Sequence, residues 1–248
     1  MHYLDFLQQV HTRLAPRHYL EIGVRWGNSL SLSRCPSVGI DPAFAIDHEL
    51  HAPVDLFRTT SDEYFARPDP LEPTGGEPFD LAFIDGLHLF EYALRDFMNT
   101  ERHSRPGSMI VFDDILPRNV DEAARDRHTG AWTGDVYPVL ETLARYRPDI
   151  LTVCVDTQPT GLLLVMGLDP SSTVLADNYD AIMRELRHAD PQPVPAELMD
   201  RTFVQAPERV LASPLLDELA ASADDVDPAT LNRRLREVAG QTLGSAYA

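Results

Sequence analysis

The sequence predicts an α/β protein with a doubly wound, mostly parallel sheet of seven strands and a helical C-terminal tail. Short apolar runs alternate along the chain with helical patterns, and the last two apolar runs are separated by a turn alone. Strands that alternate with helices form a mostly parallel sheet with helices on both faces. Strands joined by a turn pair antiparallel, so we expect an antiparallel last strand.

The expected elements follow in chain order. Apolar residues at helical spacing predict an N-terminal helix over residues 3–14. Strands are expected at residues 18–23, 37–41, 54–58, 79–85, 109–113, 150–155 and 161–166. Helices are expected between them at residues 27–34, 61–66, 88–103 and 135–146. The stretch 115–134 follows a strand as a long loop, which is either a lid or an ordinary solvated connection.

The pattern changes from residue 170 onward and becomes helical. Asp227 and Ser213 each precede a proline, as an N-cap precedes a proline at the first helical position. Gly240 is the expected end of the second of these helices. We therefore divide the chain into a domain at residues 1–169 and a helical extension at 170–248. The extension is expected to dock on the sheet domain or on a partner subunit of a homo-oligomer.

Composition excludes several classes of partner. The formal net charge is -18, which disfavours nucleic acid and anionic membranes because both require a basic face. The two cysteines, Cys35 and Cys154, have no zinc-like spacing and are expected to be reduced. The first residues do not resemble a signal peptide, and no stretch approaches the length of a membrane span. We therefore expect a cytoplasmic protein.

Three acids and one histidine follow two of the expected strands. Asp85 ends the strand at 79–85 and is followed by His88, while Asp113 and Asp114 end the strand at 109–113. Ligands of open α/β sheets bind outside the carboxyl ends of the strands. Carboxylate oxygens suit Mg²⁺, Ca²⁺ or Mn²⁺, and a histidine beside a metal can act as a general base. Each residue alone is more often a cap or a surface group, but together they predict a metal site.

A second set of residues is typical of a nucleoside site. Glu21, Gly23 and Gly27 follow the first strand, where glycine permits a tight turn and close approach of a ligand to the backbone. Asp41 ends the second strand, where an acid can accept both hydroxyls of a ribose. Ser61 follows the third strand and is either an adenine contact or part of a helix cap.

Taken together, these residues resemble the class I S-adenosylmethionine-dependent methyltransferases. The segments 84–88, 111–114 and 132–137 are similar to the bacterial O-methyltransferases that modify macrolide sugars and related natural products. The resemblance covers residues 18–167 and implies a Rossmann-like methyltransferase fold. The middle glycine of the usual first motif is absent, because Arg25 occupies its position.

The resemblance also implies cofactors and roles. Mg²⁺ or another divalent cation would be held by Asp85, Asp113 and Asp114, and His88 would be the base. S-adenosylmethionine would be bound by Glu21, Gly23, Gly27, Asp41, Ser61 and Asp85. The implied reaction is methyl transfer to a hydroxyl of a small molecule, such as a natural product or a sugar.

Two alternatives remain open at this point. One is a metal-free transfer to nitrogen or to a phenol, with His88 as the only base. The other is a homologue that binds the nucleoside without catalysis. The polar residues Glu91, Arg95 and Asp96 are expected to form a solvated helix face without a role.

Overall fold

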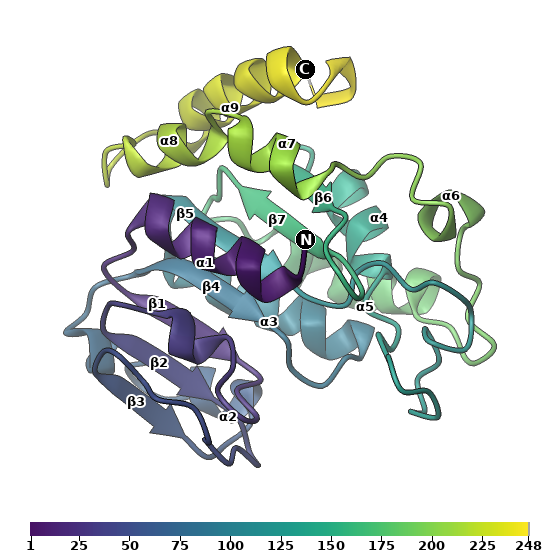
Figure 1. Ribbon diagram of the computed structural model, residues 1–248, viewed down its shortest axis with the longest axis horizontal. Helices are drawn as coiled ribbons and strands as arrows, with labels where there is room; N and C mark the ends of the chain where they lie inside the picture. Colours follow the sequence, from purple (N-terminus) through teal and green to yellow (C-terminus); the bar gives the residue numbers. More distant parts are fainter. Residues whose placement is uncertain (248) are drawn as a thin grey trace.

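The computed structural model describes residues 1–247 and contains a seven-stranded sheet with helices on both faces (Figure 1). The strands are β1 (Tyr19–Ile22), β2 (Ser37–Ile40), β3 (Val54–Phe57), β4 (Phe79–Ile84), β5 (Ser104–Phe112), β6 (Leu151–Val155) and β7 (Leu162–Met166). The α-helices are α1 (Tyr3–Leu14), α2 (Ser61–Phe65), α3 (Phe90–Arg102), α4 (Pro138–Tyr146), α5 (Val174–Leu186), α6 (Ala196–Met199), α7 (Pro207–Ala212), α8 (Leu215–Ala220) and α9 (Pro228–Thr242). Short 3₁₀ turns are η1 (Leu30–Leu32), η2 (Glu72–Thr74) and η3 (Ser245–Tyr247).

The sheet has the strand order β3-β2-β1-β4-β5-β7-β6. Strands β1 to β5 are parallel to one another, whereas β7 lies between β5 and β6 and is antiparallel to both. The predicted fold is therefore confirmed, including the antiparallel last strand. The order reverses between β1 and β4, and that reversal opens a crevice at the carboxyl ends of these strands.

Two apolar cores lie on opposite faces of the sheet. One contains Leu20 and Ile22 of β1 together with buried residues of α3, α4 and α5. The other contains Tyr19 of β1 and buried residues of α1, α7, α8 and α9. The expected C-terminal extension thus packs on both faces of the sheet rather than standing apart from it.

Several expected boundaries are corrected. The stretch 27–34 forms only the 3₁₀ turn η1 instead of a helix. Helix α9 continues through Gly240 to Thr242, and α8 begins at Leu215 with Pro214, not Ser213, as its N-cap. No helix within residues 1–247 combines the length and the apolar character needed to cross a membrane.

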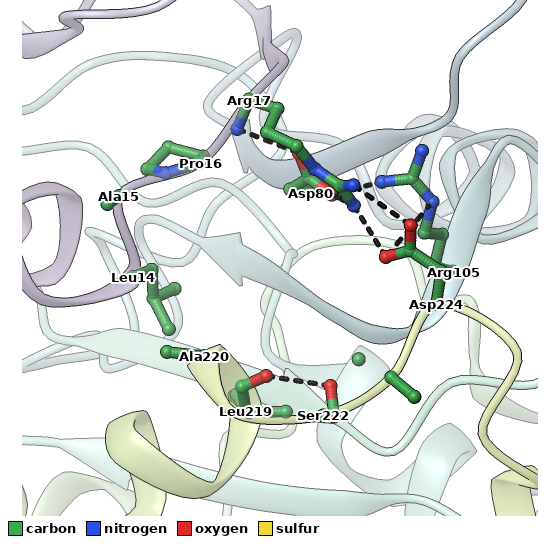
Figure 2. A pocket seen from close by; sticks show the side chains of 12 residues that line it. Leu14, Ala15, Pro16, Arg17, Asp80, Arg105, Leu219, Ala220, Ser222 and Asp224 are labelled. Atoms are coloured by element: carbon green, nitrogen blue, oxygen red, sulfur yellow. Dashed lines mark hydrogen bonds and ion pairs between the residues drawn. The ribbon is translucent and has the colours of Figure 1, made fainter.

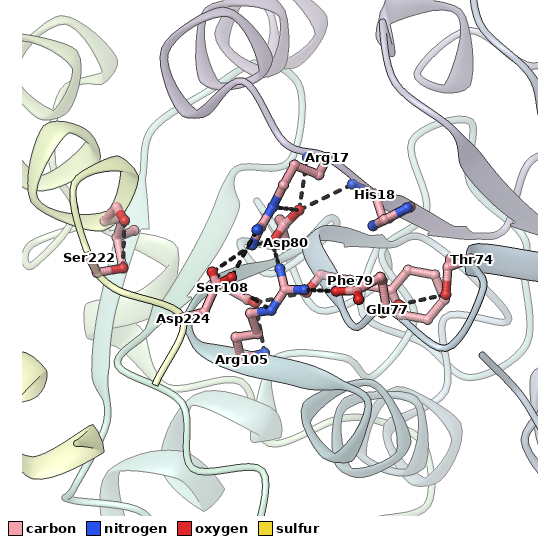
Figure 3. A network of polar contacts seen from close by, with 11 residues as sticks. Arg17, His18, Thr74, Glu77, Phe79, Asp80, Arg105, Ser108, Ser222 and Asp224 are labelled. Carbon is pink, nitrogen blue, oxygen red and sulfur yellow. Dashed lines mark hydrogen bonds and ion pairs between the residues drawn. The ribbon is translucent and has the colours of Figure 1, made fainter. Parts of the chain in front are cut away.

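An ion-pair network ties the C-terminal extension to the amino ends of β4 and β5 (Figures 2 and 3). Arg17 pairs with Asp80 at 3.0 Å and with Asp224 of the extension at 2.7 Å. Arg105 pairs with the same Asp80 at 2.6 Å, and only 9% of its side chain is exposed. A cavity of about 310 Å³ adjoins this network at the amino ends of the strands, whereas the crevice lies at their carboxyl ends (Figure 2). All four charged groups have partners, so we interpret the network as a structural anchor.

Candidate functional site

The carboxyl ends of β1, β2, β4 and β5 border a cavity of about 630 Å³. Its lining comes from the loops that follow these strands, including the long loop after β5, from the start of α1, from the residues around the first turn of α2, from α3 and from the loop between β6 and β7. The predicted site residues in the lining are Gly23, Asp41, Ser61, Asp85, His88, Asp113 and Asp114. Two largely exposed apolar side chains, Trp26 and Leu87, also belong to the lining.

The turn after β1 is shaped by Gly23. Its φ is +92°, and a Cβ at this position would lie 1.9 Å from the carbonyl oxygen of Asp85. Only glycine therefore allows the first turn to pass directly beside the loop after β4. The backbone N–H of Gly23 donates to the Ile40 carbonyl at 2.9 Å, which continues the parallel pairing to the end of β2. This contact brings the loops of three strands to one place.

Asp41 stands at the end of β2, and backbone donors fix its carboxylate. Its Oδ2 accepts from the N–H of Arg25 at 2.7 Å, and its Oδ1 accepts from the N–H of Ala43 at 2.6 Å. A carboxylate held by two backbone groups is oriented in advance, and each oxygen keeps lone pairs for a further hydrogen bond. The position and the orientation suit a pair of ligand hydroxyls.

Two predicted residues do not reach the cavity lining. Glu21 is fully buried and accepts hydrogen bonds from the Tyr19 hydroxyl at 2.7 Å and from Ser29 Oγ at 2.9 Å. Burial raises the pKa of Glu21 to about 8. Gly27 has a positive φ of +85° and packs against Ile46. Glu21 therefore supports the turn after β1 through Tyr19 and Ser29 and does not line the cavity.

Asp85, His88 and Asp114 form a compact cluster. His88 Nε2 lies 2.9 Å from Asp85 Oδ1, and His88 Nδ1 lies 3.0 Å from Asp114 Oδ2. One potential ligand atom from each of the three residues falls within 4.8 Å of the others. Asp113 lines the cavity but does not belong to this group, and its Oδ1 accepts the backbone N–H of Asp114 at 2.8 Å. The geometry thus brings together two of the three predicted carboxylate ligands and adds the histidine.

The electrostatics of this cluster favour a cation. Burial raises the pKa of Asp85 and of Asp113, and the charge of Asp114 raises both further. Burial lowers the pKa of His88, but hydrogen bonds and charges from Asp114 and Asp85 outweigh this effect and raise it well above its ordinary value. As arranged here, the two acids favour the protonated form of His88, whose single positive charge could balance only one of them.

The long loop after β5 covers His88. The indole of Trp132 stacks on the imidazole with ring centroids 4.9 Å apart, and its Nε1 donates to the Ala124 carbonyl at 2.6 Å. The loop is anchored where Arg125 pairs with Glu91 of α3 at 2.6 Å. Glu91 is therefore a structural contact rather than a member of a solvated face. The expected loop forms one wall of the cavity, and whether it moves as a lid stays a prediction.

Asp96 is a residue of this cavity that the sequence interpretation assigned to solvent. It is 2% exposed and lines the cavity from α3. The spacing along the sequence carried a signal, because Asp96 lies three residues after Ala93 and four before Thr100. The structure shows that both of these residues are buried. This helical spacing places Asp96 on the packed face of α3.

Comparison with known proteins supports the interpretation of the fold. Residues 20–115 match a family model described as a methyltransferase domain, which confirms the methyltransferase resemblance over that segment. No curated protein gives a significant match.

Solved structures to which this chain is similar include an O-methyltransferase from Bacillus cereus in complex with SAH. It is 20% identical, with a TM-score of 0.47, and the match covers 66% of this chain and 79% of that one. The O-methyltransferase TomG from Streptomyces achromogenes, in complex with SAM, is 22% identical with a TM-score of 0.47, covering 66% and 78%. The MycE methyltransferase of the mycinamycin biosynthetic pathway, in complex with Mg and SAH, is 19% identical with a TM-score of 0.43, covering 66% and 48%.

Proposed function

We propose that this chain transfers a methyl group from S-adenosylmethionine to a hydroxyl of a small molecule, with a divalent cation and His88 as the base. The observation that carries the proposal is the convergence of Gly23, Asp41 and the Asp85–His88–Asp114 cluster on one cavity. The first two suit a nucleoside, and the cluster suits the activation of a hydroxyl beside it.

The charge of the cavity supports a cationic donor. Its lining contains the carboxylates of Asp41, Asp62, Asp85, Asp96, Asp113 and Asp114. The arginines in the lining are Arg25 and Arg127 alone within residues 1–247. A surplus of carboxylates attracts a sulfonium and an ammonium group, and it repels the phosphates of a nucleotide cofactor. The same surplus favours a neutral or cationic acceptor.

The chain's own residues would divide the work as follows. Asp41 would hold the ribose hydroxyls, and the turn at Gly23 lets the donor approach the backbone. His88 would take the proton of the acceptor hydroxyl, a role worth roughly 10²–10⁴-fold in rate. Alignment of the acceptor oxygen with the methyl group would supply much of the remaining acceleration.

The donor set fits a divalent cation. Asp85 and Asp114 present hard oxygen ligands, and one atom from each lies within 4.8 Å of the other and of His88. A cation bound there would lower the pKa of a coordinated hydroxyl and would compensate the two acids. That compensation matters for His88, because its base function requires a neutral imidazole while the two carboxylates favour the protonated ring.

One observation favours the metal-free alternative. His88 already contacts both Asp85 and Asp114, so the acids are paired without an added ion. Chelation separates the two versions of the proposal. Turnover that is lost with EDTA and restored by Mg²⁺ or Mn²⁺ supports the metal-assisted reaction, whereas undiminished turnover supports the metal-free one.

We extend the proposal to acceptor class and location. The acceptor class, a natural product or a sugar, follows from the resemblance of segments 84–88, 111–114 and 132–137. A cytoplasmic location is supported by Cys35 and Cys154, which are both buried and unpaired.

Calorimetry with S-adenosylhomocysteine tests the cofactor assignment. We expect binding by the wild-type protein and a loss of at least about tenfold in affinity for Asp41→Asn, because the amide has one acceptor oxygen instead of two. Asp47→Asn is the matched control, since Asp47 lies in the same loop, is exposed and does not line the cavity. Absence of heat with the wild-type protein at high ligand concentration would remove the proposed function.

A further inference from the structure

His88 adopts a backbone conformation that its surroundings must hold in place. Its φ is +56°, in the left-handed region that a residue with a side chain occupies only at a cost. The part of the long loop after β5 that contacts His88 and the start of α3 is the segment 132–135, which we call the clamp. The proposed reaction gives the clamp no role beyond forming a wall of the cavity.

The clamp contacts His88 and the start of α3 at three points besides the ring stack. The Trp132 carbonyl oxygen lies 3.1 Å from His88 Nδ1. A Cβ at Gly134 would lie 1.8 Å from the His88 carbonyl oxygen, so only glycine lets the clamp pass this close. The fully buried Asp135 accepts the N–H of Phe90, the first residue of α3, at 3.1 Å. The ring and the backbone of His88 are thus both held from the same side.

Contacts within the long loop fix the clamp itself. The N–H groups of Thr133 and Gly134 both donate to the Glu122 carbonyl, at 2.9 and 3.1 Å. The Trp132 indole donates to the Ala124 carbonyl at 2.6 Å. Because these bonds hold the main chain of the clamp, they set the position of the Trp132 carbonyl independently of the two acids of the cluster.

This carbonyl distinguishes the two ring nitrogens of His88. A carbonyl oxygen only accepts, so Nδ1 must carry a proton to bond with it. The ring also contacts Asp114 through Nδ1 and Asp85 through Nε2, and both acids are candidate ligands of a cation. When those acids hold a cation, the Trp132 carbonyl stays in place as an acceptor, and it keeps the single proton of a neutral ring on Nδ1. Nε2 is then left with a free lone pair.

We propose that Trp132 is a positioning residue for the base: its carbonyl keeps the proton of the neutral His88 ring on Nδ1, and its indole fixes the plane of the ring. Nε2 is therefore the atom that takes the proton of the acceptor hydroxyl. The stack has the geometry this role requires, with centroids 4.9 Å apart and an angle of 15° between the rings. The assignment rests on the proposed function, because it assumes the cation and the base role of His88.

The proton and the electrons balance in this step. The O–H bond of the acceptor breaks as the Nε2–H bond of His88 forms, and the oxygen keeps the electron pair. The O–CH₃ bond forms as the S–CH₃ bond breaks, and the electron pair of that bond stays on sulfur. The imidazolium of His88 afterwards releases its extra proton to solvent.

Nuclear magnetic resonance of the histidine ring nitrogens tests this assignment without donor or acceptor. The protein is labelled with ¹⁵N in its nine histidines and saturated with Mg²⁺, and His88→Gln identifies the signals of His88 by their absence. In the neutral ring of the wild-type protein we expect the proton on Nδ1 and none on Nε2. A proton on Nε2, or comparable amounts of the two tautomers, would overturn the inference.

Gly134→Ala separates the clamp from His88, because the added Cβ would collide with the His88 carbonyl oxygen. The folded variant should show both tautomers of His88 in comparable amounts. Gly130→Ala is the matched control in the same loop, since an added Cβ there meets no atom within 4 Å, and it should keep the wild-type tautomer. If Gly134→Ala does not fold, Trp132→Ala replaces it, because it removes the stack and the indole bond and should also mix the tautomers. The wild-type tautomer alone in the folded variant would overturn the role of the clamp.

The inference and the proposed function fail in different ways. A wild-type protein that binds S-adenosylhomocysteine but carries the neutral-ring proton on Nε2 refutes the role of Trp132 and leaves methyl transfer standing. Signals of His88 that do not respond to Mg²⁺ would overturn the inference together with the metal-assisted reaction. A ring that keeps both protons at every pH at which the protein stays folded would overturn it together with the base role of His88.

Discussion

Replacing Gly23 by alanine tests whether the first turn of the sheet positions the whole site. The added Cβ would lie 1.9 Å from the carbonyl oxygen of Asp85, which is 1.5 Å less than the 3.4 Å at which ordinary contact begins. The obstacle is backbone, so no side-chain rotation relieves it. The chain must shift where the N–H of Gly23 donates to Ile40 at 2.9 Å and the N–H of Asp85 donates to Ile22 at 2.8 Å.

The cost has two physical parts. An L residue at the φ of +92° loses about 1–2 kcal/mol through backbone strain. Crowding in a packed region typically costs about 1–3 kcal/mol more. The free energy of unfolding should therefore fall by about 2–5 kcal/mol in Gly23→Ala. Because the shift moves Asp85, affinity for both S-adenosylhomocysteine and Mg²⁺ should fall as well.

Urea denaturation and calorimetry measure these effects, and Gly75→Ala is the matched control. Gly75 also has a positive φ, +68°, but an added Cβ there meets no atom within 4 Å. The control should therefore lose only the strain, about 1–2 kcal/mol, and keep wild-type ligand affinity. Equal destabilisation of the two variants, with unchanged ligand binding in Gly23→Ala, would refute the close approach of the two loops.

Three further predictions concern the cluster and the stability of the fold. Asp114→Ala should weaken Mn²⁺ binding at least about tenfold, and Asp113→Asn should weaken it clearly less, since only Asp114 belongs to the cluster. Calorimetry measures both affinities, and a larger loss in Asp113→Asn would make Asp113 the main ligand. His88→Ala should lower turnover roughly 10²–10⁴-fold, and a near-normal rate would exclude His88 as the base. Burial, with a smaller effect of the nearby Arg34, lowers the pKa of His11 from 6.5 to about 4, so the unfolded chain binds the proton more tightly. The contribution of His11 to the free energy of unfolding should then be fully present above pH 6.5 and should fall by up to about 3 kcal/mol as the pH drops toward 4. In His11→Leu, denaturation at a series of pH values should show a flatter dependence over this range. The same pH dependence in the variant and the wild-type protein would contradict the assignment.

Strands were the most predictable elements of this fold, because each is a short apolar run bounded by polar residues. The acids at the ends of β2 and β4 followed from the same pattern, since they mark the point where each apolar run stops. The helix expected at 27–34 is wrong, because the composition of this stretch disfavours a helix. Ser29, Ser31 and Ser33 compete for backbone hydrogen bonds, and Pro36 disfavours helix just before it, so only η1 forms.

The end of α9 shows how packing overrides a local signal. Gly240 costs about 1 kcal/mol in a helix interior and is a frequent stop residue. The helix nevertheless continues to Thr242, followed by Leu243, which is buried in the core shared with α1 and α8. Burial of a leucine contributes about 1.5–3 kcal/mol, which exceeds the cost of the glycine. A single sequence shows the glycine but not the core that receives the leucine.

Glu21 and Asp96 mark the limit of sequence reasoning about the site. Successive side chains of a strand point to opposite faces, so Glu21 shares the face of Tyr19 while Leu20 and Ile22 share the other. All four positions are buried, so the sequence did not reveal that Glu21 packs inside the protein, and an acid near a strand end looked like a ligand contact. Asp96 gave the opposite error, because an acid between Arg95 and Phe97 in a helix looked solvated although its spacing placed it on the packed face. In both cases the sequence shows an acid but does not show where its side chain points. That direction depends on which neighbouring elements cover each face of the strand or helix.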